Sequence, residues 1–242
     1  MSAAQRAAKL PEVAALSAQR AYQLWAPHYD SSVNPLLALE ERRLSCHLGT
    51  FAGKDVVDLG CGTGRWLIKL ETLQPKSLTG VDVSPAMLDQ ARIKCAKTTR
   101  LLHSDCNDTP LRGRSADRIL ASFLLSYLSD LPAFARESAR ILRTHGSILI
   151  SDVHPDTATY GWRRTFRAGG TVFEIETHRY TLIHLVDAME QAGFKFQHRV
   201  EWAFGPQEAR IFERAGKRDS FVKVKSLPVV YCAQFTLGGV CL

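Results

Sequence analysis

The first third of the chain contains a glycine-rich stretch beside acidic residues, which is typical of a ligand-binding turn. The stretch VVDLGCGTG begins with a short apolar run that ends at Asp58. Gly60, Gly62 and Gly64 follow at alternate positions. Glycine accepts positive φ angles and lets a ligand approach the bare backbone. The pattern predicts a buried strand, a tight turn and a helix that starts directly after the turn.

A second acidic residue, Asp82, ends the apolar run SLTGVD about two dozen residues after Asp58. A carboxylate at this place can accept hydrogen bonds from both hydroxyls of a ribose. Two ligands then fit the turn, a dinucleotide or S-adenosylmethionine. The dinucleotide pattern G-x-G-x-x-G requires a glycine where Arg65 stands, and the Asp58 carboxylate would repel a pyrophosphate. Both features favour S-adenosylmethionine, which carries an ammonium and a sulfonium charge.

Strand and helix patterns alternate regularly from Asp55, which predicts a parallel sheet covered on both faces. Two later strands form the natural antiparallel pair that closes the sheet. The predicted fold class is therefore α/β, with a doubly wound, mostly parallel seven-stranded sheet and an antiparallel last strand. The expected strands are 55–58, 77–82, 99–103, 117–122, 147–153, 195–204 and 228–236. The expected helices are 65–73, one from Ser84-Pro85, one from Leu131-Pro132 and 181–193, with a turn at 144–146 and a half-exposed strand at 171–177.

The N-terminal region has helical patterns interrupted by an aromatic segment. We expect one helix from Pro11 to Trp25 and a second that begins at Asn34-Pro35. The segment Tyr22–Asp30 between them either pins the helices to the core or acts as a lid, and the two roles are compatible. The chain then reads as one domain in four parts: a helical lid or cap (1–50), a cofactor-binding core (51–153), an insertion over the substrate pocket (154–180), and a C-terminal helix with sheet-closing strands (181–242).

Composition limits the classes of function. The net charge of +7 permits an anionic partner, and the most basic stretch, 210–225, is diluted by two acids. Six scattered cysteines form no CxxC pair and no zinc-ligand spacing, so no metal site is expected. No apolar run is long enough to cross a membrane, and residues 1–20 lack the apolar core of a secretory signal. We therefore expect a cytoplasmic protein without a membrane span.

The motifs resemble those of the class I S-adenosylmethionine-dependent methyltransferases, which have a Rossmann-like fold. DLGCGTG at 58–64 is similar to their first motif, and GVDVSPAML at 80–88 is similar to their second-strand motif. HSDC at 103–106 resembles the segment that meets the adenine, and FLL at 123–125 stands where a fourth motif faces the methionine part. The resemblance covers about 56–153. Its nearest subgroup is the small-molecule and carrier-linked enzymes, such as those of quinone and biotin biosynthesis.

The resemblance implies a role for individual residues. Asp82 would bind the ribose, Asp105 and the Cys106 amide would meet the adenine, and Tyr22 and Tyr29 would close over the cofactor. The sequence does not decide whether Arg65 lies on the surface of its helix or contributes to the site. The full set that the resemblance implies for S-adenosylmethionine is Tyr22, Tyr29, Asp58, Gly60, Cys61, Gly62, Asp82, Val83, Met87, Asp105, Cys106 and Phe123.

Candidate residues on the acceptor side follow the fifth strand. Asp152 and His154 alternate with Val153 and so share one face of the strand end. His154 is a candidate general base because an imidazole titrates near neutral pH, although a structural role at the strand end is the alternative. His178, in the insertion, is a weaker candidate. Arginines in the insertion either bind a carboxylate or phosphate or lie in solvent.

The leading hypothesis is therefore an enzyme (EC 2.1.1.-) that methylates a small molecule and releases S-adenosylhomocysteine. The acceptor atom and the oligomeric state are left open. The alternatives are an RNA or protein methyltransferase that uses the basic C-terminal face, and a non-catalytic cofactor-binding protein of the same fold. An NAD-dependent oxidoreductase is a more distant alternative. Nucleic acid is not the expected partner, because the strand-4 end, SFLLSY, lacks the Asn/Asp-Pro-Pro-Tyr arrangement associated with base-amine methylation.

Overall fold

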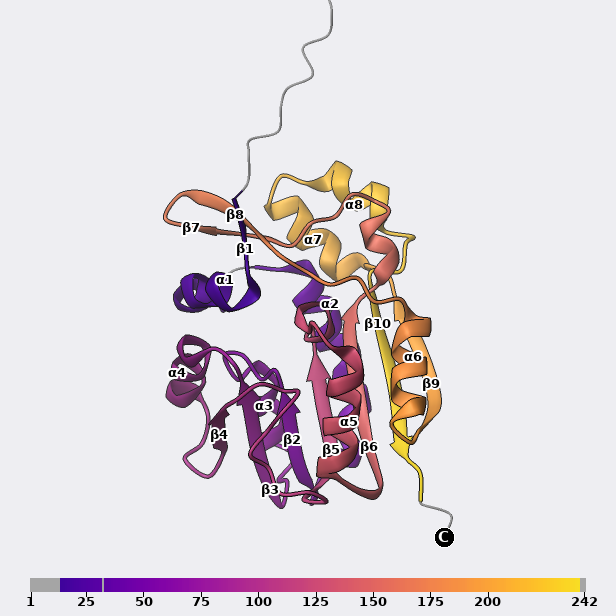
Figure 1. The fold of residues 1–242 in the computed structure, drawn as a ribbon. Helices are drawn as coiled ribbons and strands as arrows, with labels where there is room; N and C mark the ends of the chain where they lie inside the picture. Colours follow the sequence, from indigo (N-terminus) through magenta and orange to yellow (C-terminus); the bar gives the residue numbers. More distant parts are fainter. Residues whose placement is uncertain (1–13, 32, 240–242) are drawn as a thin grey trace, which may run out of the picture.

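The computed structural model describes residues 14–31 and 33–239, and seven strands of this part of the chain form the main sheet (Figure 1). Their order is β4-β3-β2-β5-β6-β10-β9. The neighbours among β2 to β6 are parallel, and β10 is antiparallel to both β6 and β9. The predicted sheet is confirmed. The strands are β2 (Asp55–Leu59), β3 (Ser77–Asp82), β4 (Arg100–His103), β5 (Ala116–Ser122), β6 (Leu142–Val153), β9 (Phe194–Trp202) and β10 (Val230–Leu237).

Helices cover both faces of this sheet because alternate strand residues point to opposite sides. Val57 and Ile119 pack with residues of α5 and α6, whereas Val56 and Leu120 pack with residues of α2, α3 and α7. All four strand residues are buried. The α-helices of the described residues are α1 (Ala18–Trp25), α2 (Pro35–Leu44), α3 (Arg65–Glu71), α4 (Pro85–Lys94), α5 (Leu131–Ile141), α6 (Leu182–Gln191), α7 (Pro206–Arg214) and α8 (Arg218–Val224).

Polar side chains cap the helices whose starts the sequence predicts. Asn34, Ser84, Asp130 and Thr181 each accept a hydrogen bond from an amide of the first turn that follows. In the first three of these helices a proline stands within the first two positions. Proline suits this place because its missing N–H would have no partner within the helix. The predicted starts at Asn34-Pro35, Ser84-Pro85, Leu131-Pro132 and Thr181 are therefore confirmed.

The N-terminal helix is shorter than predicted. Pro11 lies outside the described residues, and β1 (Ala14–Leu16) is a strand where a helix was expected. β1 pairs in parallel with β8 (Thr171–Ile175), which pairs in turn with β7 (Thr165–Ala168) in a separate three-stranded sheet. The half-exposed strand predicted at 171–177 is present as β8. The small sheet packs on α1 through Ala21, Phe166 and Ile175, apart from the main sheet (Figure 1).

Two other differences concern the later part of the chain. The predicted turn at 144–146 lies inside β6, where the pairing jumps from Ala116↔Leu142 to Arg118↔Ser147 and the extra residues bulge out. The basic stretch at 210–225 belongs to α7 and α8, which were not predicted. The start of α7 could have been predicted from Pro206, its first residue, and from Glu208, whose carboxylate accepts a hydrogen bond from the Gly205 amide at 2.8 Å.

Within residues 14–31 and 33–239, no helix combines the length and the apolar composition needed to cross a membrane. The same residues contain no group of three or more His, Cys, Asp or Glu side chains arranged to hold a metal ion.

Candidate functional site

The glycine-rich turn after β2 is held against the end of β3 by backbone hydrogen bonds. The amides of Gly60 and Cys61 donate to the carbonyl oxygen of Val81 at 2.8 and 3.0 Å. Gly60 has a φ of +72°, and a Cβ atom there would lie 2.8 Å from the side chain of Leu124. The backbone therefore follows a path, close to the loop after β5, that only glycine can take without strain.

Asp82, the last residue of β3, fixes the rest of the turn. Its Oδ2 accepts from the Gly62 amide and its Oδ1 from the Ser84 amide, both at 2.8 Å. Burial raises the pKa of this carboxyl group, and the two backbone amides oppose the rise. A carboxylate has about four lone-pair sites, so each oxygen retains capacity for a ligand hydroxyl.

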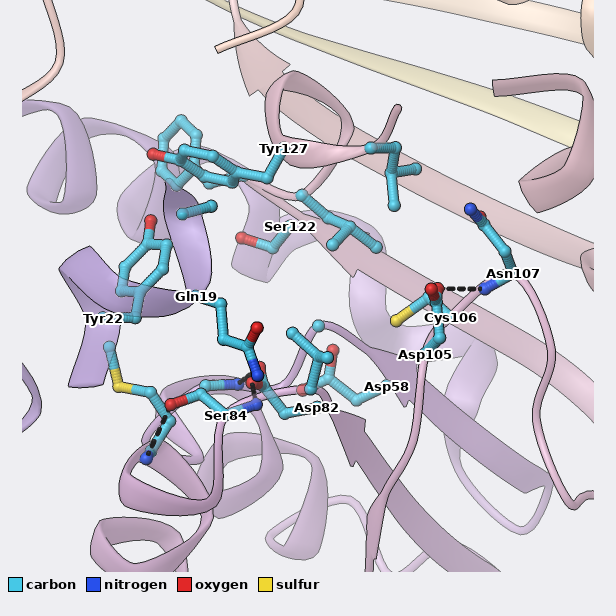
Figure 2. Close-up of a pocket in the computed structure, with 18 of the residues that line it drawn as sticks. Gln19, Tyr22, Asp58, Asp82, Ser84, Asp105, Cys106, Asn107, Ser122 and Tyr127 are labelled. Carbon is cyan, nitrogen blue, oxygen red and sulfur yellow. Dashed lines mark hydrogen bonds between the residues drawn. The ribbon is translucent and has the colours of Figure 1, made fainter. Parts of the chain in front are cut away.

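A cavity of about 360 Å³, here called the turn cavity, opens beside the turn and extends under α1 (Figure 2). Its lining also includes residues that the sequence motifs do not indicate as cofactor residues, among them Gln19, Asn107, Ser122 and Tyr127. Nothing in the sequence around Gln19 indicates that it lines a cavity. Asn107 could have been inferred, because it lies two residues after Asp105. The predicted cofactor residues that line the cavity are Tyr22, Tyr29, Asp58, Gly60, Gly62, Asp82, Val83, Met87, Asp105, Cys106 and Phe123.

Cys61 is the predicted cofactor residue that does not line the turn cavity. Its backbone belongs to the turn, but its side chain is buried in the core, where it would lie 2.8 Å from a Cβ atom at Gly80. Burial also raises the pKa of the Cys61 thiol well above its usual value, so the protonated form dominates. The side chain thus packs against β3 and does not face the cavity.

Two buried oxygen atoms of the turn cavity have no hydrogen-bond partner among the described residues, Asp58 Oδ2 and Asn107 Oδ1. Burial raises the pKa of the Asp58 carboxyl well above its usual value, while the nearby Arg65 charge opposes the rise. Asp105 Oδ1 accepts from the Asn107 amide at 2.8 Å (Figure 2). Unpaired buried acceptors are rare in folded proteins and require an explanation such as a bound donor.

Aromatic residues from α1 and its C-terminal extension cover the turn cavity. The Tyr22 ring meets the Tyr127 ring edge-on at 5.2 Å, and the Trp25 ring meets the Tyr29 ring at 4.7 Å. Burial raises the pKa of Tyr29 to about 12 and that of Tyr22 well above its usual value. These phenols therefore remain protonated. Asp30 fastens the same segment to the turn, since it accepts from the Thr63 hydroxyl at 2.8 Å and pairs with Lys94.

Arg65 lies in a buried polar network and not on the surface, which decides between the two positions that the sequence left open. Its Nη2 lies 2.7 Å from Glu40 Oε2, and the Glu40 side chain is fully buried. Glu40 Oε1 also accepts from the hydroxyls of Ser122 and Ser151 at 2.7 and 2.6 Å. Trp66 Nε1 donates to the Ser122 hydroxyl at 3.0 Å. The network joins α2 to α3 and to the carboxyl ends of β5 and β6.

A second cavity, of about 180 Å³, lies beyond the ends of β6 and is here called the polar cavity. His178 lines both this cavity and the turn cavity. Asp152 and His154 line the polar cavity from the end of β6, but neither lines the turn cavity. Both nitrogens of the buried His154 ring have neighbours, since Nδ1 accepts from the Asp156 amide at 3.3 Å and Nε2 lies 3.3 Å from Glu201 Oε1.

The fold is Rossmann-like, and the turn cavity lies at the carboxyl ends of the strands, where open α/β sheets bind their ligands. Residues 56–146 match the methyltransferase domain family. The chain is 34% identical over 117 residues to a demethylmenaquinone methyltransferase of Tropheryma whipplei, covering 47% of this chain and 48% of the relative. It is 33% identical over 131 residues to a malonyl-[acyl-carrier protein] O-methyltransferase of Serratia marcescens, covering 54% and 50%. The chain thus spans about half the length of these curated relatives.

Solved structures share the fold across most of the chain. An S-adenosylmethionine-dependent methyltransferase of Mesorhizobium loti superposes with a TM-score of 0.66 at 21% identity, covering 84% of this chain and 100% of that one. The [4+2]-cyclase SpnF superposes with a TM-score of 0.67 at 18% identity, covering 93% and 98%. The matched segment is thus similar to a methyltransferase domain, and the whole fold is similar to that of an S-adenosylmethionine-dependent methyltransferase of known structure. The cyclase shows that the fold alone does not specify the reaction.

Proposed function

We propose that the protein transfers the methyl group of S-adenosylmethionine to a small-molecule acceptor and releases S-adenosylhomocysteine. The observation that carries the proposal is the unpaired, buried carboxylate oxygen of Asp58 in the same cavity as Asp82 and Asp105. An unpaired carboxylate suits a ligand with an ammonium group and disfavours a pyrophosphate. The relatives named as methyltransferases support the same conclusion.

The residues of the turn cavity fit this cofactor. Asp58 would pair with the ammonium of the methionine part, and the bare backbone of Gly62, where nothing lies within 4 Å of an added Cβ atom, would leave room for it. Asp82 would accept from the ribose hydroxyls. Asp105 and the Cys106 amide would meet the adenine. Tyr22 and Tyr29 would cover the cofactor from the lid.

The mechanism requires mainly alignment and exclusion of water by the protein. When bound, the cofactor supplies a methyl group on a positively charged sulfur, which is already activated for in-line displacement. Tyr127 and Phe123 border the cavity on the side of the loop after β5 and would exclude water from the reaction path. The aromatic lid and the Asp30 contacts would hold the acceptor space closed, so that proximity accounts for much of the rate.

A small acceptor, and not a nucleic acid, is the second part of the proposal. The candidate acceptor space is bordered by two parts of the chain, the lid in 1–50 and the insertion in 154–180. The basic residues of α7 and α8 border neither the turn cavity nor the polar cavity. A charged face away from the cavity is usual for a soluble surface.

The test is incubation of the protein with S-adenosylmethionine carrying a labelled methyl group and a small-molecule extract. Label in a small product, with an equal amount of S-adenosylhomocysteine, is expected. Tight cofactor binding in calorimetry without S-adenosylhomocysteine from any acceptor would instead support the non-catalytic alternative. Label in RNA or protein would support the alternative that uses the basic face.

His178 is the better placed of the two candidate bases, because it lines both cavities and its ring makes no hydrogen bond to the other described residues. For an acceptor that loses a proton, His178→Ala is expected to lower kcat about 100-fold. His154→Gln retains a donor toward Glu201 and should keep kcat within about threefold. Turnover of the His178 variant close to that of the wild type would mean that His178 is not the base.

Cofactor binding is expected to release a proton from Asp58. Burial raises the pKa of this carboxyl in the free protein, so it retains its proton above the usual carboxyl pKa. An adjacent ammonium favours the ionised form and lowers that pKa. Affinity should therefore increase with pH up to the raised pKa, by at most about tenfold per pH unit. Calorimetry in buffers of different ionisation enthalpy measures the proton, and Asp58→Asn should abolish its release. An enthalpy independent of the buffer in the wild type would contradict the assignment.

A further inference from the structure

A third cavity shares lining residues with both the turn cavity and the polar cavity. It has a volume of about 140 Å³ and is here called the aromatic cavity. Tyr22, Tyr29, Phe123 and Tyr127 line both it and the turn cavity. Its remaining lining is aliphatic and aromatic except at Asn34, Thr165 and two arginines. An apolar acceptor group of about one ring would fill this space.

Arg164 stands where the aromatic and polar cavities meet, since it lines both. Its Cζ atom lies 5.7 Å from the ring centre of Phe123 and 5.8 Å from that of Tyr127. Its side chain is 24% exposed, and Nη2 lies 3.1 Å from Asp152 Oδ1. That contact is its one side-chain hydrogen bond to the other described residues. The remaining N–H groups of the guanidinium are thus available to a ligand.

Asp152, which pairs with Arg164, also accepts several other hydrogen bonds. Asp152 accepts from the amide and the hydroxyl of Ser126, both at 3.1 Å, and from the Val153 amide at 2.6 Å. It is 1% exposed. Asp152 therefore holds the guanidinium in position by one edge and has little capacity left for a second donor.

The charges around the polar cavity match a ligand with one negative charge. Three arginines and two carboxylates line it, which leaves an excess of one positive charge when the histidines are neutral: Arg163, Arg164 and Arg179 against Asp152 and Glu174. Arg163 pairs with Glu174 at 2.7 Å, as Arg164 pairs with Asp152. A guanidinium fork matches the two oxygens of a carboxylate.

We propose that the acceptor is a monocarboxylic acid with an apolar or aromatic body, that Arg164 binds its carboxylate, and that the body occupies the aromatic cavity beside the methyl donor. This substrate class rests on the proposed function, because it takes the turn cavity as the cofactor site. The competing explanation is that the Arg164–Asp152 pair only attaches the insertion to β6.

The experiment measures probe binding to the full chain saturated with S-adenosylhomocysteine, so no turnover is needed. The probes are 3-phenylpropionate and its neutral amide, 3-phenylpropionamide, which have nearly the same shape. Calorimetry is expected to give an affinity for the acid at least about tenfold above that for the amide. Equal affinities, or no binding of the acid at millimolar concentration, would overturn the proposal.

Three variants separate binding from structure. Arg164→Gln should remove the preference for the acid and leave the affinity for the amide unchanged. Asp152→Asn should increase the preference about threefold or more, because the guanidinium loses its neutralising partner. Arg167→Gln is the matched control, since Arg167 is exposed on the same insertion, donates to the Gly170 carbonyl oxygen and lines none of the cavities. It should retain the wild-type preference.

A merely structural pair predicts a different result, in which Arg164→Gln and Asp152→Asn lower the melting temperature alike and neither alters the preference. That result would overturn the proposal. Arg164→Lys distinguishes a loss of binding from a folding defect. It keeps the positive charge and should retain part of the preference for the acid. If the proposed function is wrong, the wild-type protein will not bind S-adenosylhomocysteine. The preference for the acid is measured only on protein that binds S-adenosylhomocysteine, so the two failures can be distinguished.

Discussion

Replacing Asp82 by alanine is expected to weaken the binding of S-adenosylmethionine by about 3 kcal/mol, which is more than a hundredfold in Kd. Two losses add. The carboxylate accepts hydrogen bonds from the amides of Gly62 and Ser84, so its removal leaves two partly buried donors without this partner and loosens the turn. The proposed ribose hydroxyls also lose an ionised acceptor, and hydrogen bonds to charged groups are the stronger kind.

Calorimetric titration of the Asp82 variant with the cofactor and with S-adenosylhomocysteine measures this effect. Asp89→Ala is the matched control, since Asp89 lies on α4, the next helix, and forms an exposed pair with Arg92. The control should bind as the wild type does. A Kd within threefold of the wild-type value for Asp82→Ala would refute the ribose assignment. Thermal unfolding without ligand shows how much of the loss comes from the turn itself.

The parts of the fold that could be predicted depend on neighbours in sequence. The turn after Asp58, the caps at Ser84 and Thr181 and the strand that ends at Asp82 are each specified within about six residues. Side-chain oxygens beside a first helical turn and glycines at a sharp bend act locally. The order of these signals was therefore enough to predict the main sheet.

The parts that could not be predicted depend on partners far along the chain. Ala14–Leu16 is a strand only because β8 offers an edge for it, and nothing in its own three residues indicates this. Arg65 could not be decided from its surroundings in α3 because its partner, Glu40, lies on α2. Tertiary contacts of this kind override local propensity.

His154 illustrates the same limit within the candidate site. The alternation with Asp152 predicted that both side chains share one face, and both line the polar cavity, as Val153 between them also does. The neighbour of the His154 ring, Glu201, comes from β9 and lies 3.3 Å away. A histidine with both ring nitrogens engaged is less available as a base. The sequence could place the residue on a face but could not show what occupies its nitrogens.

Glu40→Ala is expected to lower the free energy of unfolding by about 3 kcal/mol, since removal of one member of a buried ion pair leaves the other uncompensated. Arg65 would lose its 2.7 Å partner, and the hydroxyls of Ser122 and Ser151 would lose the acceptor that they share. Arg65 and Ser122 line the turn cavity, so cofactor affinity should fall as well.

Urea unfolding followed by fluorescence measures the change in stability, and Glu41→Ala provides a control at the next position of the same helix. Glu41 lies 3.8 Å from Arg65 and 2.9 Å from Lys69, but its side chain is 42% exposed. Solvent screens such pairs, so the control should lose less than about 1 kcal/mol. Equal losses in the two variants would mean that the Glu40 network contributes no more than a surface pair. A larger loss at Glu40 would show that burial makes this network a stabilising link between α2 and the carboxyl ends of β5 and β6.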